Sequence, residues 1–295
     1  MANPMLDIVR GLIYGNILPL GKLSPGARVF ATLMGKRGDI VPFLAPQIHD
    51  HAMTVAKVPA RKYYYDAELL VNTELAVERW YGFDAPMITA DNYNFELEAL
   101  GAKMVYSDYG MPTVDTYQPL IKERADFDRL GELDPTKGRI PVGVEIARLS
   151  AAKGLGLFAN GLFCAPFSFI CGATGYPKAV RALRKDQAFA RELFDYAENK
   201  AIFPYLKVQA KAGVKQTIGA DAWAAFPNPT PEMTAEWVVP SALRLKQRGK
   251  KELKMRVSAG AAAADERSHA RVPPAQRRRS GAARRRTHPR RRGGP

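Results

Sequence analysis

Two acidic residues stand directly after short apolar runs, at positions where a carboxylate could do chemistry. Asp91 follows the run 84–89, and Asp221 follows the run 214–219. In parallel α/β proteins, side chains at the carboxyl ends of strands converge on one face and form the active site. We therefore predict that Asp91 and Asp221 are catalytic. The alternative for each is a structural role, in which the carboxylate caps the turn that follows.

Further polar and aromatic residues near such strand ends are candidates for substrate binding. Asn160 and Cys164 lie at the end of the run 155–163, Phe167 follows Cys164, and Tyr93 follows the first of the two acids. Cys164 could supply a thiolate ligand or a nucleophile. A buried small residue is the preferred interpretation, because free cysteines are among the most buried residue types.

The segment His49-Asp50-His51 is an unusual local cluster. In an extended chain it would place two imidazoles on one side, where they could bind a metal or a substrate. Without further ligands nearby, a polar loop that lines the pocket is the preferred interpretation, and we predict no metal site. The tyrosines 63–65 either stack on a flat ligand or form a half-buried entry into a helix.

Helices and strands alternate along the first 255 residues. Capping residues and apolar spacing predict helices that begin near Ser24, Asp66, Val142, Asp186 and Thr230, with interruptions at Pro204 and Pro240. Apolar runs predict strands at 40–46, 84–89, 102–106, 112–114, 155–163, 214–219 and 251–255, and the third and fourth form a hairpin.

This alternation is typical of parallel α/β folds. The lack of a Gly-rich phosphate loop after the first strand argues against a dinucleotide-binding fold and favours a (β/α)8 TIM-type barrel. About five barrel strands are recognisable, against the eight of a closed barrel. We therefore predict a truncated α/β barrel domain over residues 1–255.

Composition predicts a soluble chain, with the cytoplasm as the default compartment. It has 295 residues, 46% of them hydrophobic, which is enough for a sizeable core. No apolar stretch is long enough to span a membrane, and Asp7, Arg10 and Asn16 interrupt the N-terminal apolar patches, so no secretory signal is predicted. The two cysteines, Cys164 and Cys171, do not suggest a disulfide framework.

Residues 256–295 have a different composition from the rest. They hold 12 arginines and two acidic residues, out of a net charge of +15, and no Leu, Ile, Phe, Tyr or Trp. Such a segment cannot offset the conformational entropy of ordering, so a disordered tail is predicted. It could bind nucleic acid through its charge. We favour a reading-frame shift in a GC-rich gene, which would leave the tail without an evolved function. An inactive truncated product is a further alternative.

Three stretches resemble the uroporphyrinogen decarboxylase superfamily, which also contains corrinoid-dependent methyltransferases. The first runs from Ala76-Val77-Glu78-Arg79-Trp80-Tyr81-Gly82-Phe83-Asp84 through Ala90-Asp91 to Glu98-Ala99-Leu100-Gly101. The second is Cys164-Ala165-Pro166-Phe167-Ser168-Phe169 with Tyr176-Pro177, and the third runs from Ala212-Gly213 to Asp221-Ala222-Trp223-Ala224. The resemblance covers about residues 25–255 and implies a barrel enzyme.

Departures from the family pattern favour the methyltransferase branch. The decarboxylases hold substrate carboxylates with an Arg-Gln-Ala-Gly-Arg segment, and here the corresponding stretch 47–53 has no arginine. The resemblance therefore implies methyl transfer between a corrinoid carried by a partner protein and a small-molecule acceptor. Uroporphyrinogen decarboxylation, with Asp91 on the pyrrole nitrogens, is the alternative. The methyltransferases bind zinc through a His-x-Cys pair and a distant Cys. No His-x-Cys is present, so zinc would require a C-terminal third that this sequence lacks.

Overall fold

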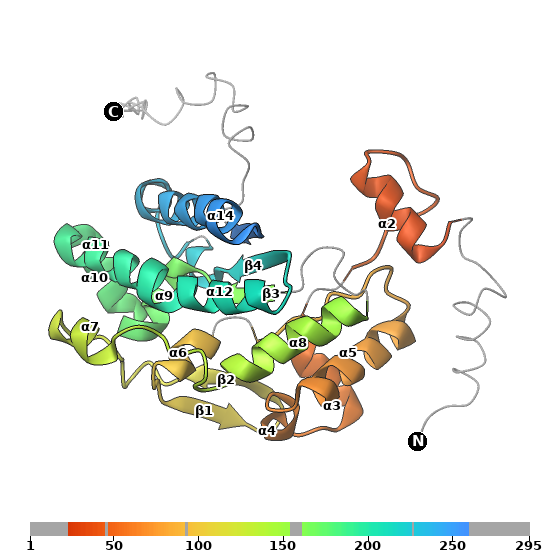
Figure 1. The fold of residues 1–295 in the computed structure, drawn as a ribbon, viewed down its shortest axis with the longest axis horizontal. Helices are drawn as coiled ribbons and strands as arrows, with labels where there is room; N and C mark the ends of the chain where they lie inside the picture. The colour runs from red at the N-terminus through yellow and green to blue at the C-terminus, as the bar shows by residue number, and fades with distance from the viewer. Residues whose placement is uncertain (1–22, 45–46, 92–93, 154–160, 226, 260–295) are drawn as a thin grey trace, which may run out of the picture. The chain divides into compact units, whose positions relative to one another are not determined.

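The computed structural model describes residues 23–259 apart from 45–46, 92–93, 154–160 and 226. These residues belong to the compact unit Met1–Ala262. The described part is mostly helical and carries two small sheets (Figure 1). One sheet is an antiparallel hairpin of β1 (Met104–Ser107) and β2 (Gly110–Val114), which confirms the predicted hairpin.

The second sheet is parallel and positions the site. Its strands are ordered β3 (Gly161–Cys164), β4 (Gln216–Ala220) and β5 (Arg256–Ala259). Cys164 pairs in register with Ala220, so β3 and β4 end side by side. Residues 155–160, the first part of the strand predicted at 155–163, lie outside the described residues.

Helical crossovers connect the parallel strands. Between β3 and β4 lie α9 (Pro166–Thr174), α10 (Tyr176–Lys185), α11 (Gln187–Tyr196), the π-helical turn η1 (Ala197–Ile202) and α12 (Phe203–Lys211). Between β4 and β5 lie the 3-10 turn η2 (Ala222–Ala224), α13 (Pro231–Met233), the π-helical turn η3 (Thr234–Val238) and α14 (Val239–Leu253). One buried apolar cluster extends from Met53 and Leu70 to Phe163 and Val257.

The predicted helix starts and interruptions agree with the structure. The Asp186 side chain accepts the Phe189 N–H at the start of α11, and Thr230 accepts the Met233 N–H at the start of α13. Pro204 and Pro240 each occupy the second position of the α-helix that follows a π turn. Because proline lacks an N–H and crowds the preceding turn, the wider π turn lets the chain continue as a helix.

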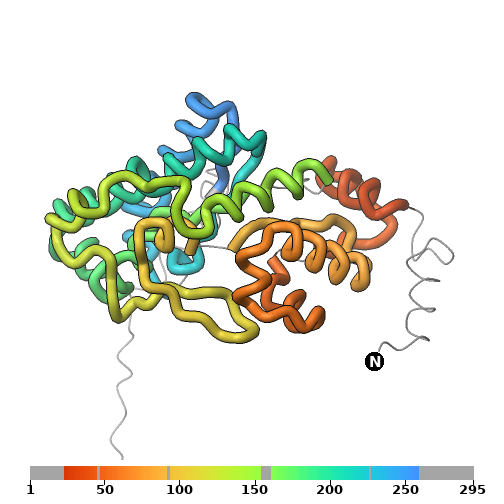
Figure 2. The backbone as a smooth tube through the Cα atoms, turned by 60° about the horizontal axis from the view of Figure 1, so that its bottom comes forward, coloured from red at the N-terminus to blue at the C-terminus, as the bar shows by residue number. Residues whose placement is uncertain are grey.

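The chain before β3 is a helical layer around the hairpin. It consists of α2 (Pro25–Leu33), α3 (His49–Ala56), α4 (Ala60–Tyr63), α5 (Ala67–Tyr81), α6 (Phe95–Ala99), α7 (Ala125–Leu130) and α8 (Ile140–Ala152). Asp66 caps α5 by accepting the Leu69 N–H, and Gly82 ends it at φ 71° in the left-handed region. Helix α5 packs against both α3 and α8 (Figure 2).

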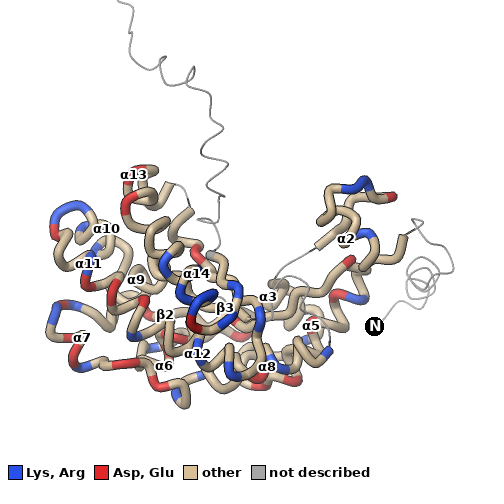
Figure 3. The backbone as a smooth tube through the Cα atoms, turned by 45° about the horizontal axis from the view of Figure 1, so that its top comes forward, with Lys and Arg blue, Asp and Glu red and all other residues tan. Residues whose placement is uncertain are grey.

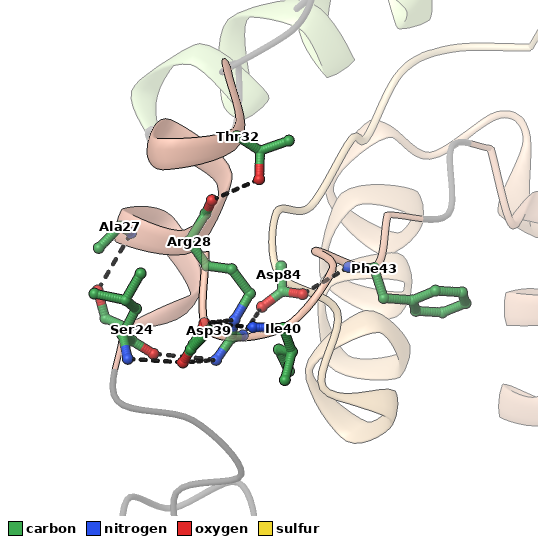
Figure 4. A network of polar contacts seen from close by, with 9 residues as sticks. Ser24, Ala27, Arg28, Thr32, Asp39, Ile40, Phe43 and Asp84 are labelled. Atoms are coloured by element: carbon green, nitrogen blue, oxygen red, sulfur yellow. Dashed lines mark hydrogen bonds and ion pairs between the residues drawn. The ribbon is translucent and has the colours of Figure 1, made fainter. Parts of the chain in front are cut away.

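A buried arginine anchors α2. Arg28 forms ion pairs with Asp39 and Asp84, and its guanidinium also donates to the Leu23 carbonyl (Figure 4). Asp84 in turn accepts the Phe43 N–H, and the Asp84 N–H donates to the Phe43 carbonyl. These contacts bring the segments around residues 43 and 84 side by side.

Two of the predicted strands are wrong in the described residues. Residues 40–44 and 84–89 form no strand, although Phe43 and Asp84 touch. Val41 is 87% exposed and Phe43 is 60% exposed, so the first run is not buried as the prediction required. In the second run Ile88 and Thr89 are buried without forming a strand, so an apolar run alone does not distinguish a strand from buried irregular chain.

The end of the predicted domain also differs. Residues 251–253 belong to α14, and the strand lies at Arg256–Ala259, within the range assigned to the tail. Gly249 lets α14 pack closely on β5, because a Cβ at position 249 would lie 2.3 Å from Val257 Cγ2. Residues 260–295, which hold the rest of the predicted disordered tail, lie outside the described residues.

The predicted α/β class is confirmed and the closed barrel is not seen. The described residues contain three parallel strands and one hairpin, and these do not close on themselves. Strands β3, β4 and β5 with their helical crossovers have the βαβ connectivity from which parallel folds are built.

Candidate active site

A cavity of about 400 Å³ lies beyond the carboxyl ends of β3 and β4, walled by the hairpin and helix α9. Its lining within the described chain is Asn94, Leu97, Thr113, Val114, Thr116, Ser168, Gly172, Ala222, Trp223 and Asn228. These described residues include amides, hydroxyls and apolar groups and no charged side chain. Such a lining suits a small uncharged ligand that is held by a few hydrogen bonds.

Asp221 forms hydrogen bonds with Ser168, which lines the cavity. Because β3 and β4 are parallel neighbours, the residue that follows β4 meets the first turn of α9. Asp221 Oδ1 accepts the Ser168 hydroxyl at 2.7 Å and the Ser168 N–H at 3.1 Å. The Trp223 N–H donates to Ser168 Oγ at 3.1 Å. Burial raises the pKa of Asp221 to about 6, although both bonds from Ser168 act to lower it.

Asp91 forms a hydrogen bond with Asn94, another residue that lines the cavity. The Asn94 amide donates to Asp91 Oδ1 at 3.0 Å, and Asp91 Oδ2 lies 2.8 Å from Arg139 Nη2. Arg139 also pairs with Glu98. The side chains of Asp91 and Arg139 are fully buried. Both predicted carboxylates therefore contact the cavity through a neighbour, Asn94 or Ser168, that lines it.

Arg139 is held by aromatic rings as well as by acids. Its guanidinium carbon lies 4.6 Å from the centre of the Phe95 ring and 5.5 Å from that of Tyr65. Burial acts to lower the pKa of Arg139, but the carboxylates of Asp91 and Glu98 outweigh it and raise that pKa. Arg139 is therefore a permanent cation that fixes the orientation of Asp91.

A third buried acid, Glu96, contacts the end of β3. Glu96 Oε1 accepts the Cys164 N–H at 2.8 Å, and burial raises the pKa of Glu96 to about 8. The bond from Cys164 lowers this pKa without compensating the burial. At neutral pH the carboxyl group is therefore mostly protonated.

The two histidines do not share a site. They lie in α3 and not in an extended segment, so positions two apart point to different sides of the helix. His49 is buried and paired through Nδ1 with Glu74, which also accepts the Tyr63 hydroxyl at 2.8 Å. His51 is exposed, with Nε2 3.0 Å from the Tyr81 hydroxyl. The expectation of two imidazoles on one side is wrong.

Burial acts to lower the pKa of His49, but the Glu74 carboxylate outweighs it and raises that pKa. The neighbouring tyrosines are also engaged within the protein. The Tyr64 hydroxyl donates to Asp50 at 2.8 Å, and the Tyr65 hydroxyl donates to Glu98 at 2.9 Å. The tyrosines thus join α3, α4 and α6, in keeping with the structural interpretation of this segment.

Cys164 and Phe167 are fully buried and do not line the described cavity. Burial raises the pKa of the Cys164 thiol well above its usual value, which removes its nucleophilic character. Tyr93 and Asn160 lie outside the described residues. Sequence reasoning missed Ser168, Asn94 and Arg139. Ser168 and Asn94 lie within three residues of Cys164-Ala165 and Asp91, whereas nothing in the sequence marks Arg139 as buried.

The described residues offer zinc no complete ligand set. No group of three His, Cys, Asp or Glu side chains within the described ranges is placed to hold a metal ion. Cys164 and Cys171 are buried free thiols, and His49 is already paired with Glu74. We therefore assign no step to a metal bound by these residues.

The chain belongs to the uroporphyrinogen decarboxylase (URO-D) family, whose sequence pattern matches residues 24–260. It is similar to a uroporphyrinogen decarboxylase from Myxococcus xanthus (strain DK1622), with 29% identity over 154 residues. That alignment covers 50% of this chain and 42% of the relative, so the chain spans less than half of that protein's length in the alignment.

A solved structure shares the fold. A methyltransferase from Methanosarcina mazei superposes with a TM-score of 0.63 at 17% identity, covering 81% of this chain and 69% of the other. At this identity the similarity concerns the fold alone. No helix in the described ranges is both long enough and apolar enough to cross a membrane.

Proposed function

We propose that this URO-D family protein is a methyltransferase that binds a small, uncharged polar acceptor in the cavity beyond β3 and β4. The observation that carries the proposal is the described lining, which has hydroxyl and amide groups on two walls and no charge. A volume of about 400 Å³ lies at the low end of small-molecule sites. Both features suit an alcohol or a thiol of a few carbon atoms.

The lining argues against a porphyrinogen substrate. A tetrapyrrole with eight carboxylates needs several cationic partners, ideally arginines that bind in bidentate fashion. Arg28 is committed to Asp39 and Asp84, and Arg139 to Asp91 and Glu98. Asp91, which would have to face the pyrrole nitrogens, is directed at Arg139 and Asn94. Decarboxylation remains the second candidate because the Myxococcus xanthus relative carries that name.

The methyl donor in this proposal is a methylcorrinoid carried by a partner protein, which supplies an electrophilic methyl group. The chain's own contribution is to bind and orient the acceptor. Asn94, fixed by Asp91, and Ser168, fixed by Asp221, both line the cavity. Because each is held by a buried carboxylate, the acceptor meets hydrogen-bonding groups of fixed orientation.

Nucleic-acid binding through the arginine-rich residues 260–295 is a separate hypothesis. In the described part, both signs of charge are spread over the helices (Figure 3). A chain ending at residue 259 would lose a salt-sensitive RNA affinity if the hypothesis holds. Equal RNA binding by the full and shortened chains would exclude it.

The test of the proposed function is a substrate comparison with the purified full-length chain. Free methylcobalamin serves as donor with a panel of short alcohols and thiols, and uroporphyrinogen is assayed in parallel. Methylated product from a neutral acceptor, with no carboxyl loss from uroporphyrinogen, is the expected result. Carboxyl loss from uroporphyrinogen without methyl transfer would replace the proposal with its alternative.

A further inference from the structure

We propose that Asp221 is the base that takes the proton of the methyl acceptor, and that the Ser168 hydroxyl relays this proton. The inference rests on the proposed function and assigns the acid–base step within it. It applies to acceptors that are neutral when they bind, such as alcohols, and that must lose a proton as the new bond to carbon forms.

The hydrogen bonds of Ser168 determine what a ligand can do there. A serine hydroxyl has one proton and two acceptor lone pairs. The proton is directed at Asp221 Oδ1 at 2.7 Å, and one lone pair accepts the Trp223 N–H at 3.1 Å. Ser168 is 2% exposed and lines the cavity, and in this proposal its second lone pair accepts the hydrogen bond that a ligand donates. A ligand that donates a hydrogen bond is therefore accepted, and one that can only accept gains nothing.

The proton then has a defined route. As the acceptor's X–H bond breaks, its proton moves to Ser168 Oγ, and the Ser168 proton moves to Asp221 Oδ1. The freed lone pair on X forms the bond to the methyl carbon, and the bond between methyl and donor breaks with its electron pair left on the donor. The products are the methylated acceptor, the demethylated donor and a protonated Asp221.

The surroundings of Asp221 suit this role. The carboxylate is buried, and its titration midpoint near 6 lies close to neutral pH, where a general base is most effective. The other titratable groups facing it are Cys164 on β3 and Cys171 on α9. Burial raises the pKa of both thiols well above the usual value, so neither competes for the proton at neutral pH.

The alternative for Asp221 is a structural role, because it accepts the Ser168 N–H in the first turn of α9. Asp221→Asn keeps an oxygen that can accept this N–H, whereas it cannot take a proton. The substitution therefore separates the two roles.

The experiment compares full-length wild type, Asp221→Asn and Ser168→Ala, with Asp134→Asn as the matched control at an exposed turn. Each is assayed for methyl transfer to a neutral alcohol and to a thiol that is ionised before it binds. With the alcohol, Asp221→Asn is expected to lower kcat by about 10²–10⁴-fold, and Ser168→Ala by at least about 10-fold. With the ionised thiol, which has no proton to lose, the fall in kcat for Asp221→Asn and Ser168→Ala should be much smaller than with the alcohol, and Asp134→Asn should match wild type with both acceptors. Equal losses with both acceptors would overturn the relay in favour of a structural role.

A second measurement does not depend on methyl transfer. In the full-length chain labelled with ¹³C at aspartate carboxyl groups, the resonance lost in Asp221→Asn should titrate with a midpoint near 6. In Ser168→Ala the midpoint should rise, because the hydrogen bond from the Ser168 hydroxyl, which lowers the pKa of Asp221, is lost. A midpoint near the ordinary aspartate value would overturn the role of Asp221 as base. If the wild type transfers no methyl group while the titration is as expected, the proposed function fails and the proton-accepting pair stands.

Discussion

Replacing Glu96 by glutamine should make the protein less sensitive to alkaline pH. Glu96 is 1% exposed, and burial raises its pKa from 4.5 to about 8. Between pH 4.5 and about pH 8, the folded protein therefore holds a proton on Glu96 that the unfolded chain has lost. The contribution of Glu96 to the free energy of unfolding is therefore greatest at low pH and is lost as the pH rises through this window.

The size of this effect follows from the two pKa values. At 1.36 kcal/mol for each tenfold change in proton affinity, the full loss is ~5 kcal/mol. Between about pH 5 and about pH 8 the loss is ~3 kcal/mol, because the titration is incomplete at both ends. In Glu96→Gln the Cys164 N–H keeps its acceptor oxygen, and the pH-dependent loss disappears.

The assay is urea unfolding of the full-length chain at the two pH values, followed by circular dichroism. Asp221 and other groups also titrate, so the quantity compared is the change in unfolding free energy of wild type minus that of the variant. Wild type should lose ~3 kcal/mol more than Glu96→Gln. Glu123→Gln, at an exposed position, should follow wild type. Equal pH dependence in wild type and Glu96→Gln would refute the reasoning.

Two further predictions concern the buried groups around the cavity. Arg139→Met should destabilise the fold by about 3–5 kcal/mol, because it leaves Asp91 and Glu98 without their cation; an unchanged urea midpoint would contradict this. Cys164 and Cys171 should react with a disulfide reagent only as fast as the protein opens, because both thiols are buried with raised pKa values. Labelling at the rate of a free thiol would show that one of them is accessible.

Local signals in the sequence were sufficient for the capped helices and for the hairpin, but not for α3, where an extended segment was expected. The caps at Asp66, Asp186 and Thr230 each accept the N–H that the sequence implied, and Gly82 ends α5 in the left-handed region. These features depend on side chain and backbone within one turn, so a single sequence contains them.

The strands and the site depended on packing that is not local. The run 40–44 is apolar but exposed. The strand expected at 251–255 lies at Arg256–Ala259, because α14 extends to Leu253. Asp221 follows β4 as predicted, whereas the run before Asp91 forms no strand, and each acid has a partner far along the chain. Arg139 pairs with Asp91 across 48 residues of chain, and Ser168 bonds Asp221 across 53. Such pairings follow from the tertiary fold and have no signature in the spacing of residues.

The central claim is that the cavity beyond β3 and β4 binds the substrate, and a steric block tests it most directly. Ala222 lines the cavity and is exposed, so Ala222→Leu fills the space without disturbing the core. Ala225, also exposed and three residues further on, is outside the described lining and provides the matched control as Ala225→Leu. With the neutral acceptor, Ala222→Leu should raise KM by at least about 10-fold, the cost of a leucine-sized intrusion into a small site, while Ala225→Leu keeps the wild-type KM. Wild-type KM and kcat in a folded Ala222→Leu variant would place the substrate elsewhere and contradict the account.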